Sequence, residues 1–163
     1  MKKTCLLVCA LAAAFMLGSC KSAPVEEEQD NVNLSFETVY NKYEGKLILD
    51  GATDYEVRSG DTLTRISREK YGSGKGYYFP LIMLASTDVV HDPDLIEPGM
   101  RLSVPDLQRN LDDPGARQAM KEFFADIADV YEWKSTNEER LVLRNLAVQT
   151  RQGLLQLVEE LGE

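Results

Sequence analysis

Two short stretches of the chain alternate apolar and polar residues, which is the pattern of a half-buried strand. Residues 55–57 read Tyr-Glu-Val and residues 102–104 read Leu-Ser-Val. Between them, residues 62–70 and 80–87 carry apolar side chains at helical spacing. The pattern therefore predicts the order strand, helix, helix, strand.

The start and end signals agree with these two helices. The turn "SGDT" precedes the first helix, and we expect Asp61 to be its N-cap because a carboxylate accepts hydrogen bonds from the first-turn amides. Leu63 and Ile66 are expected to face inward. Three glycines at 72, 74 and 76 end the helix, and Pro80 suits the first turn of the second helix.

Beyond Pro105 the pattern changes to two long amphipathic helices. Asp113 is the expected cap of the first, and Thr136 with Glu139 predicts a capping box for the second. A short polar turn joins the helices, which predicts an antiparallel helical hairpin in residues 106–163. The fold class is therefore α+β, a small βααβ unit followed by helices. The apolar stripes are Ala116, Met120, Phe123, Phe124, Ile127 and Tyr131, then Leu143, Leu146, Ala147, Leu154, Leu157, Val158 and Leu161.

Residues 34–54 lead into the βααβ unit. A helix is expected first, because four apolar or aromatic residues recur at helical spacing before Gly45, namely Phe36, Val39, Tyr40 and Tyr43. Two apolar runs then surround Asp50-Gly51. They fit either a hairpin or a strap that docks on the body before the first strand, and the pattern leaves both open.

The N-terminal end has the pattern of a cleaved signal. Lys2 and Lys3 precede a continuous apolar run at residues 5–17, which is shorter than the roughly 20 residues of a membrane span. The run ends in "LGSC", which resembles the bacterial lipobox. We therefore expect a signal peptide at residues 1–19 and fatty acyl chains, such as palmitate, on Cys20. The polar, acidic residues 20–33 are expected to form a flexible tether.

Charge and cysteine content limit the classes of ligand and partner that the protein can bind. Removal of residues 1–19 takes away two lysines and changes the formal net charge from −9 to −11, a balance that repels nucleic acid and anionic lipid. Membrane attachment is therefore expected through the acyl chains on Cys20, since two or more give a stable anchor. With one cysteine left and His91 as the lone histidine, no internal disulfide, metal site or cofactor is expected.

Residues 55–105 resemble a LysM domain. The resemblance rests on "YEVRSGDTLTRIS", then "YG" at Tyr71-Gly72, then "DPDLIEPGMRLSVP". It departs from the family at Ser86-Thr87, where many members carry an asparagine. Tyr77, Tyr78 and Phe79 also stand in a region where many members have a tryptophan.

The resemblance implies a βααβ fold and binding to N-acetylglucosamine-containing glycan, chiefly peptidoglycan in bacteria. It places the sugar in a groove between the turn before the first helix and the loop before the second strand. The implied binding residues are Gly60, Asp61, Thr62 and Leu63 on one side, with Pro93, Asp94, Leu95 and Ile96 on the other.

Other chemistries fit these residues less well. Ser59, Thr62 and His91 lack a nucleophile elbow, and "SGDT" lacks the lysine of a phosphate loop. The acid pair Asp92 and Asp94, like Asp112-Asp113 and Glu138-Glu139, is expected to be solvated or to complement helix dipoles. No enzyme is therefore expected.

The sequence predicts a lipid-anchored protein of the bacterial cell envelope, facing the periplasm or cell wall, that binds peptidoglycan through one module. The alternative is a protein-interaction adaptor with a weak or lost sugar site. In that case residues 113–161 recruit a protein partner or self-associate. A further alternative is a regulator of a separate cell-wall hydrolase.

Overall fold

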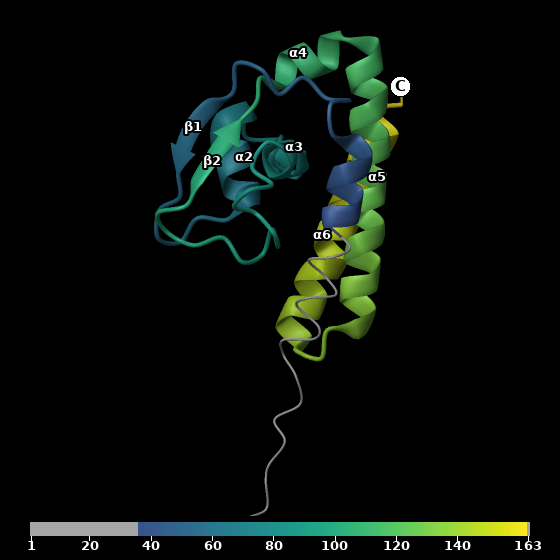
Figure 1. Ribbon diagram of the computed structural model, residues 1–163. Coiled ribbons are helices and arrows are strands. Elements are labelled where there is room, and N and C mark those ends of the chain that lie inside the picture. Colours follow the sequence, from purple (N-terminus) through teal and green to yellow (C-terminus); the bar gives the residue numbers. More distant parts are fainter. Residues whose placement is uncertain (1–35, 163) are drawn as a thin grey trace, which may run out of the picture.

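The computed structural model describes residues 36–162. The predictions for the signal peptide, Cys20 and the tether lie outside these residues. Figure 1 shows the strands with α2 and α3 on one side of the molecule and the long helices α5 and α6 on the other. In chain order the elements are β1 (Thr53–Glu56), α2 (Leu63–Tyr71), the 3-10 helix η1 (Gly76–Tyr78), α3 (Phe79–Leu84), β2 (Arg101–Val104), α4 (Leu107–Asp112), α5 (Pro114–Asn137) and α6 (Leu141–Glu160).

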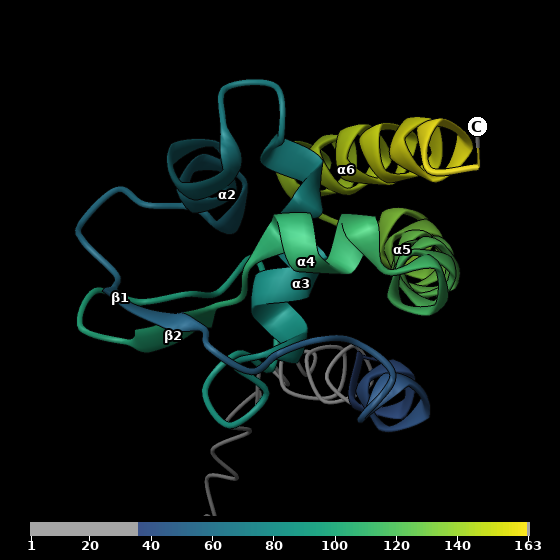
Figure 2. The same ribbon diagram turned by 90° about the horizontal axis from the view of Figure 1, so that it is seen from above.

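Residues 53–104 form the βααβ unit. The strands β1 and β2 pair antiparallel, with Tyr55 opposite Leu102, and both of these side chains are buried. The helices α2 and α3 pack beside this sheet (Figures 1 and 2). The predicted order of strand, helix, helix, strand is therefore confirmed, although a 3-10 turn precedes the second helix, which is α-helical only from Phe79 to Leu84.

The cap of α2 is Thr62, so the prediction of Asp61 as N-cap is wrong. The Thr62 hydroxyl accepts a hydrogen bond from the Arg65 amide. The Asp61 carboxylate instead turns back, where it accepts from the Tyr55 hydroxyl and the Arg58 amide, both at 2.8 Å. A threonine directly before the helix can satisfy a first-turn amide as well as an aspartate can, which leaves Asp61 to close the turn behind it.

The chain before β1 is a helix followed by a strap. Residues 36–43 are helical, and Gly45 follows with a φ of 73°. Ile48 is then held by Asn110 of α4. The Asn110 side chain accepts a hydrogen bond from the Ile48 amide and donates one to the Ile48 carbonyl, each at 2.9 Å. No strand forms at residues 44–52. The strap is therefore the correct alternative and the hairpin around Asp50-Gly51 is not, because a side chain supplies the hydrogen bonds that a paired strand would have supplied.

The helical hairpin of α5 and α6 is present as predicted. Asp113 caps α5 by accepting from the Ala116 amide at 2.7 Å, and Pro114 occupies the first turn. The predicted stripe of α5, residues 116–131, is buried at every named position. The helix α4 was not predicted. Its six residues are too few to show a helical period, and Asp106 caps it.

The capping box at Thr136 and Glu139 is wrong. The helix α5 continues to Asn137, so Thr136 lies inside it and donates to the Glu132 carbonyl at 3.0 Å. Arg140 stands at the N-cap position of α6, and no side chain there caps the helix. A hydroxyl that bonds the preceding turn of its own helix is an ordinary alternative to capping.

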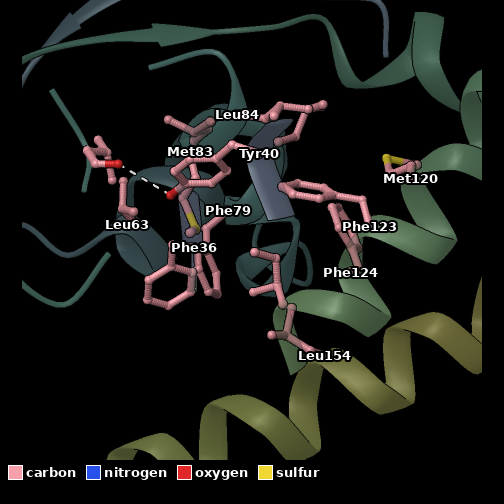
Figure 3. Packing of buried hydrophobic residues seen from close by; sticks show 14 of the residues in the cluster. Phe36, Tyr40, Leu63, Phe79, Met83, Leu84, Met120, Phe123, Phe124 and Leu154 are labelled. Atoms are coloured by element: carbon pink, nitrogen blue, oxygen red, sulfur yellow. Dashed lines mark hydrogen bonds between the residues drawn. The ribbon is translucent and has the colours of Figure 1, made fainter. Parts of the chain in front are cut away.

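One continuous group of buried side chains joins the βααβ unit to the hairpin. The rings of Tyr78 and Phe124 meet edge to face with centroids 6.0 Å apart. Figure 3 shows Phe123 and Phe124 of α5 pointing toward the interior that also holds Phe79 of α3 and Leu154 of α6. The hairpin is therefore packed against the βααβ unit over a shared core.

Candidate functional site

The structure brings two separate loops together at one cleft of about 310 Å³. We call residues 58–62 the first loop and residues 91–97 the second loop. The predicted residues that line this cleft are Asp61, Thr62, Leu63, Pro93, Asp94 and Ile96. Gly60 precedes Asp61 in the chain and has a φ of 83°, and nothing lies within 4 Å of where its Cβ would be. Backbone can therefore approach a ligand closely at this turn.

Leu95 faces away from the cleft. It is 47% exposed and lines a separate depression of about 540 Å³, together with His91 and Met100. Asp94 and Ile96 line both the cleft and this depression, whereas Leu95 lines the depression alone. His91 is exposed and also lies outside the cleft that contains Thr62.

The first loop is stabilised by its own neighbours. The hydrogen bond from the Arg58 amide lowers the pKa of the Asp61 carboxyl, and the Tyr55 hydroxyl bond and two nearby arginines act in the same direction against a smaller effect of burial. Asp61 is therefore a structural carboxylate that stays charged. Of the first-turn amides of α2, that of Arg65 donates to the Thr62 hydroxyl, and those of Leu63 and Thr64 before it have no partners within the helix ladder.

The second loop is held from outside the βααβ unit, by α5. Lys134 donates to both carboxylate oxygens of Asp92 at 2.9 Å and to Asp94 at 2.7 Å. The Tyr131 hydroxyl donates to the other oxygen of Asp94 at 3.2 Å. Asp92 is buried, so the expectation that it is solvated is wrong, whereas Asp94 is an exposed residue. The two acids pair with a buried cation, which a buried carboxylate requires.

The charge on Lys134 is favoured by the same contacts. Burial alone would lower its pKa, but the Asp94 and Asp92 carboxylates outweigh burial and hold the pKa above its ordinary value. The Lys134 ammonium and the two carboxylates therefore form an ion cluster that ties the second loop to α5. A sequence signal existed, because Lys134 follows Ile127 and Tyr131 on the same face of α5 and is the charged member of an apolar stripe.

Ser86 braces the turn that follows α3. Its hydroxyl accepts from the Ser103 amide at 2.9 Å and donates to the Ser103 carbonyl at 3.4 Å, and its side chain is buried. The segment leading to the second loop is thus hydrogen-bonded to β2. The serine at this position, where many members of the family carry an asparagine, fills a bracing role of its own.

The helical hairpin supplies a third side of the cleft, which sequence reasoning missed. Tyr131 of α5 lines the cleft, as do four residues of α6: Leu143, Leu146, Gln149 and Thr150. Leu143 and Leu146 were predicted to be packing residues, but Leu146 is 43% exposed. Tyr77 and Phe79 also line the cleft. They belong to the region where many LysM domains have a tryptophan.

The comparisons with known proteins agree with this geometry. The family model of the LysM domain matches residues 55–105. Residues 55–105 are a LysM domain. No curated protein and no solved structure matches the chain significantly. The cleft therefore lies between two loops of the LysM domain and the helices that follow it.

A LysM domain is a carbohydrate-binding module without catalytic activity, and it binds N-acetylglucosamine-containing glycans such as peptidoglycan. The α+β fold class, with two antiparallel strands and a helical C-terminal region, is confirmed. Within residues 36–162, no group of acidic, histidine or cysteine side chains could hold a metal ion. The same residues include no helix that is both long and apolar enough to span a membrane.

Proposed function

We propose that this protein binds peptidoglycan in the cleft of its LysM domain and performs no chemistry on it. The observation that carries the proposal is that the first loop, which ends at residue 62, and the second loop, which begins at residue 91, line one cleft. Six of the eight residues implied by the family resemblance line that cleft, and Gly60 directly precedes one of them, Asp61.

The cleft offers what an N-acetyl group needs. Such a group requires a hydrogen-bond donor, an acceptor and a small apolar surface for its methyl. The amides of Leu63 and Thr64 at the start of α2 are donors, backbone carbonyls at the loops are acceptors, and Ile96 supplies the apolar surface. Gly60 leaves room for the sugar to approach the backbone.

The proposal includes a location in the bacterial cell envelope, with acyl chains on Cys20 as the anchor. The "LGSC" sequence and the basic, apolar segment before it support this. Anchoring would keep the LysM domain close to the cell wall, so that even a weak single site would be occupied at the high local concentration of glycan.

The binding proposal is tested with the soluble form that begins after Cys20, sedimented with purified peptidoglycan. Thr62→Tyr fills the cleft from the first loop, and Ile96→Asp places a charge in it from the second loop. Both variants are expected to lose retention, because each removes space or apolar contact from the same cleft. Circular dichroism verifies that both remain folded.

The matched control is Leu95→Asp, which introduces the same charge one residue away but on the side of the neighbouring depression. It is expected to be retained like the wild type. Loss of retention in both Leu95→Asp and Ile96→Asp, with normal retention of Thr62→Tyr, would move the site to the depression, which both residues line. Lack of wild-type retention would exclude peptidoglycan binding.

The anchor is tested separately with the full chain. Metabolic labelling with palmitate should mark the wild type and not Cys20→Ser, and detergent-phase partitioning should be lost in the same variant. Equal labelling of both would rule out Cys20 as the acylated residue.

A second candidate, a protein-interaction adaptor, is favoured by the start of α6. Leu141 and Val142 are exposed there, Val142 by 78%, and Val148 lies two turns from Leu141 on the same face. The double variant Leu141→Glu, Val142→Glu tests it. Loss of self-association in sedimentation equilibrium would support the adaptor function. So would loss of retention on peptidoglycan in this double variant, if Ile96→Asp is still retained.

A further inference from the structure

The cleft of the LysM domain is bounded by α6, an element outside the family match. Leu143, Leu146 and Thr150 are three and four residues apart, so they lie on one face of α6, and Gln149 adjoins this face. The same cleft contains Thr62 of the first loop and Ile96 of the second. A ligand seated between the two loops would therefore also meet α6.

This wall is fixed relative to both loops. At Gly153 of α6 a Cβ would lie only 2.1–2.4 Å from ring carbons of Tyr77, so the glycine allows the LysM domain to touch the helix backbone. Leu154, the next residue, and Leu157, one turn further, are buried in the shared core. Because Lys134 ties the second loop to α5, all three sides of the cleft belong to one packed body.

The side chains that line this wall suit a sugar. Sugars present hydroxyls together with apolar C–H surfaces, so they need hydrogen-bonding side chains next to apolar ones. Within residues 36–162, the side chains of Gln149 and Thr150 form no hydrogen bond, although Thr150 is buried to 7% exposure. Leu146 provides adjacent apolar surface that packing in the hairpin leaves uncovered.

We propose that α6 is the third wall of the glycan site, and that Leu146, Gln149 and Thr150 contact the bound sugar. The inference rests on the proposed function. It turns a groove that would be open on one side into a cleft with three sides. At about 310 Å³ the cleft is at the lower limit of small-ligand sites, which run from about 300 to 1,000 Å³. The helical hairpin is thus a determinant of affinity and of the size of sugar accepted.

The test measures binding of a soluble N-acetylglucosamine oligomer by calorimetry, with the protein beginning after Cys20. Gln149→Ala and Thr150→Val are each expected to weaken binding about 2–10-fold, which corresponds to one lost hydrogen bond. Leu146→Trp fills the cleft from α6 and is expected to weaken binding by more than about 10-fold, as Thr62→Tyr does from the opposite side.

Val148→Trp is the matched control, since Val148 is on the same helix and is 39% exposed but does not line the cleft. It should bind like the wild type. In a nuclear magnetic resonance titration, the side-chain amide signals of Gln149 should shift with sugar, whereas those of the exposed Gln152 should not. This readout does not depend on how any substitution affects folding.

The outcomes separate the inference from the proposed function. If Thr62→Tyr and Ile96→Asp abolish binding while Leu146→Trp and Gln149→Ala bind normally, the third wall is wrong and the two-loop site stands. If the wild type binds no oligomer, the proposed function and the third wall fall together. Weakening by Val148→Trp equal to that by Leu146→Trp would also overturn the wall, since it would reflect a general disturbance of α6.

Discussion

The two loops of the cleft are held in different ways. The first loop closes on Asp61, whose partners Tyr55 and Arg58 lie within six residues. The second loop is held by Lys134, which is 42 residues beyond Asp92 and belongs to the helical hairpin. The first loop is therefore a property of the LysM domain alone, whereas the geometry of the second depends on helices that the family match does not include.

The largest expected effect comes from removing the external brace. Lys134→Met leaves the Asp92 carboxylate buried without its cation, so we expect the free energy of unfolding to fall by about 3–5 kcal/mol. Urea denaturation measures it. Lys42→Met is the control, because Lys42 pairs with Asp126 at an exposed position and should change stability little. Equal losses in the two variants would show that the buried cluster does not hold the second loop.

A smaller effect is expected where α6 meets the LysM domain. Gly153→Ala drives a methyl group into the Tyr77 ring and should destabilise by about 1–3 kcal/mol. The sign of this stability change identifies the close contact, since alanine ordinarily stabilises a helix by up to about 1 kcal/mol relative to glycine. Thermal unfolding measures it, with Gly74→Ala, where a Cβ meets nothing within 4 Å, as the control. A stabilised Gly153→Ala would contradict the close contact.

The smallest effect concerns the first loop, and it depends on pH. Hydrogen bonds from the Arg58 amide and Tyr55 lower the pKa of Asp61 in the folded protein. Its stabilisation is therefore present above the ordinary aspartate pKa of about 3.9 and is lost as pH falls through the lower folded value. Asp61→Asn should cost about 0.5–1 kcal/mol at pH 7.

The difference between Asp61→Asn and the wild type should shrink when urea denaturation is repeated at pH 3. Asp54→Asn, at an exposed aspartate of β1 outside the first loop, provides the control. A difference that stays constant from pH 7 to pH 3 would mean that the charge of Asp61 has no part in closing the first loop.

The contrast between the loops also explains how far sequence reasoning reached. Alternation at residues 55–57 and 102–104 and the cap at Asp113 depend on neighbours in sequence, so β1, β2 and the start of α5 could be predicted. At "SGDT" two adjacent residues could each cap α2, and local rules do not rank Asp61 below Thr62. Tyr55 decides between them, because its hydroxyl donates a hydrogen bond to the Asp61 carboxylate and Thr62 is left to cap the helix.

The parts of the site that were missed depend on distant contacts. Asp92 and Asp94 look like exposed loop acids until Lys134 is placed beside them by the fold. Leu146 fits a helical stripe equally well whether it is packed or faces a cleft. Lys134 within an apolar stripe and Gly153 within a helix were the two signals available, since a charge in a stripe needs a partner and a helical glycine often marks a close approach.

The helical segment 36–43 gives the molecule a directional response to mechanical load. The segment runs antiparallel to α5. Its C-terminal residue Tyr43 packs on Phe123 of α5, and Phe36, seven residues before Tyr43, packs on Tyr131, eight residues after Phe123. The Tyr43 hydroxyl also donates to Asp126 at 2.9 Å. A pull on residue 36 along this axis must slide all of these contacts at once instead of opening them one by one. Force that enters from the N-terminal side is thus carried first by α5, the helix that also holds the second loop.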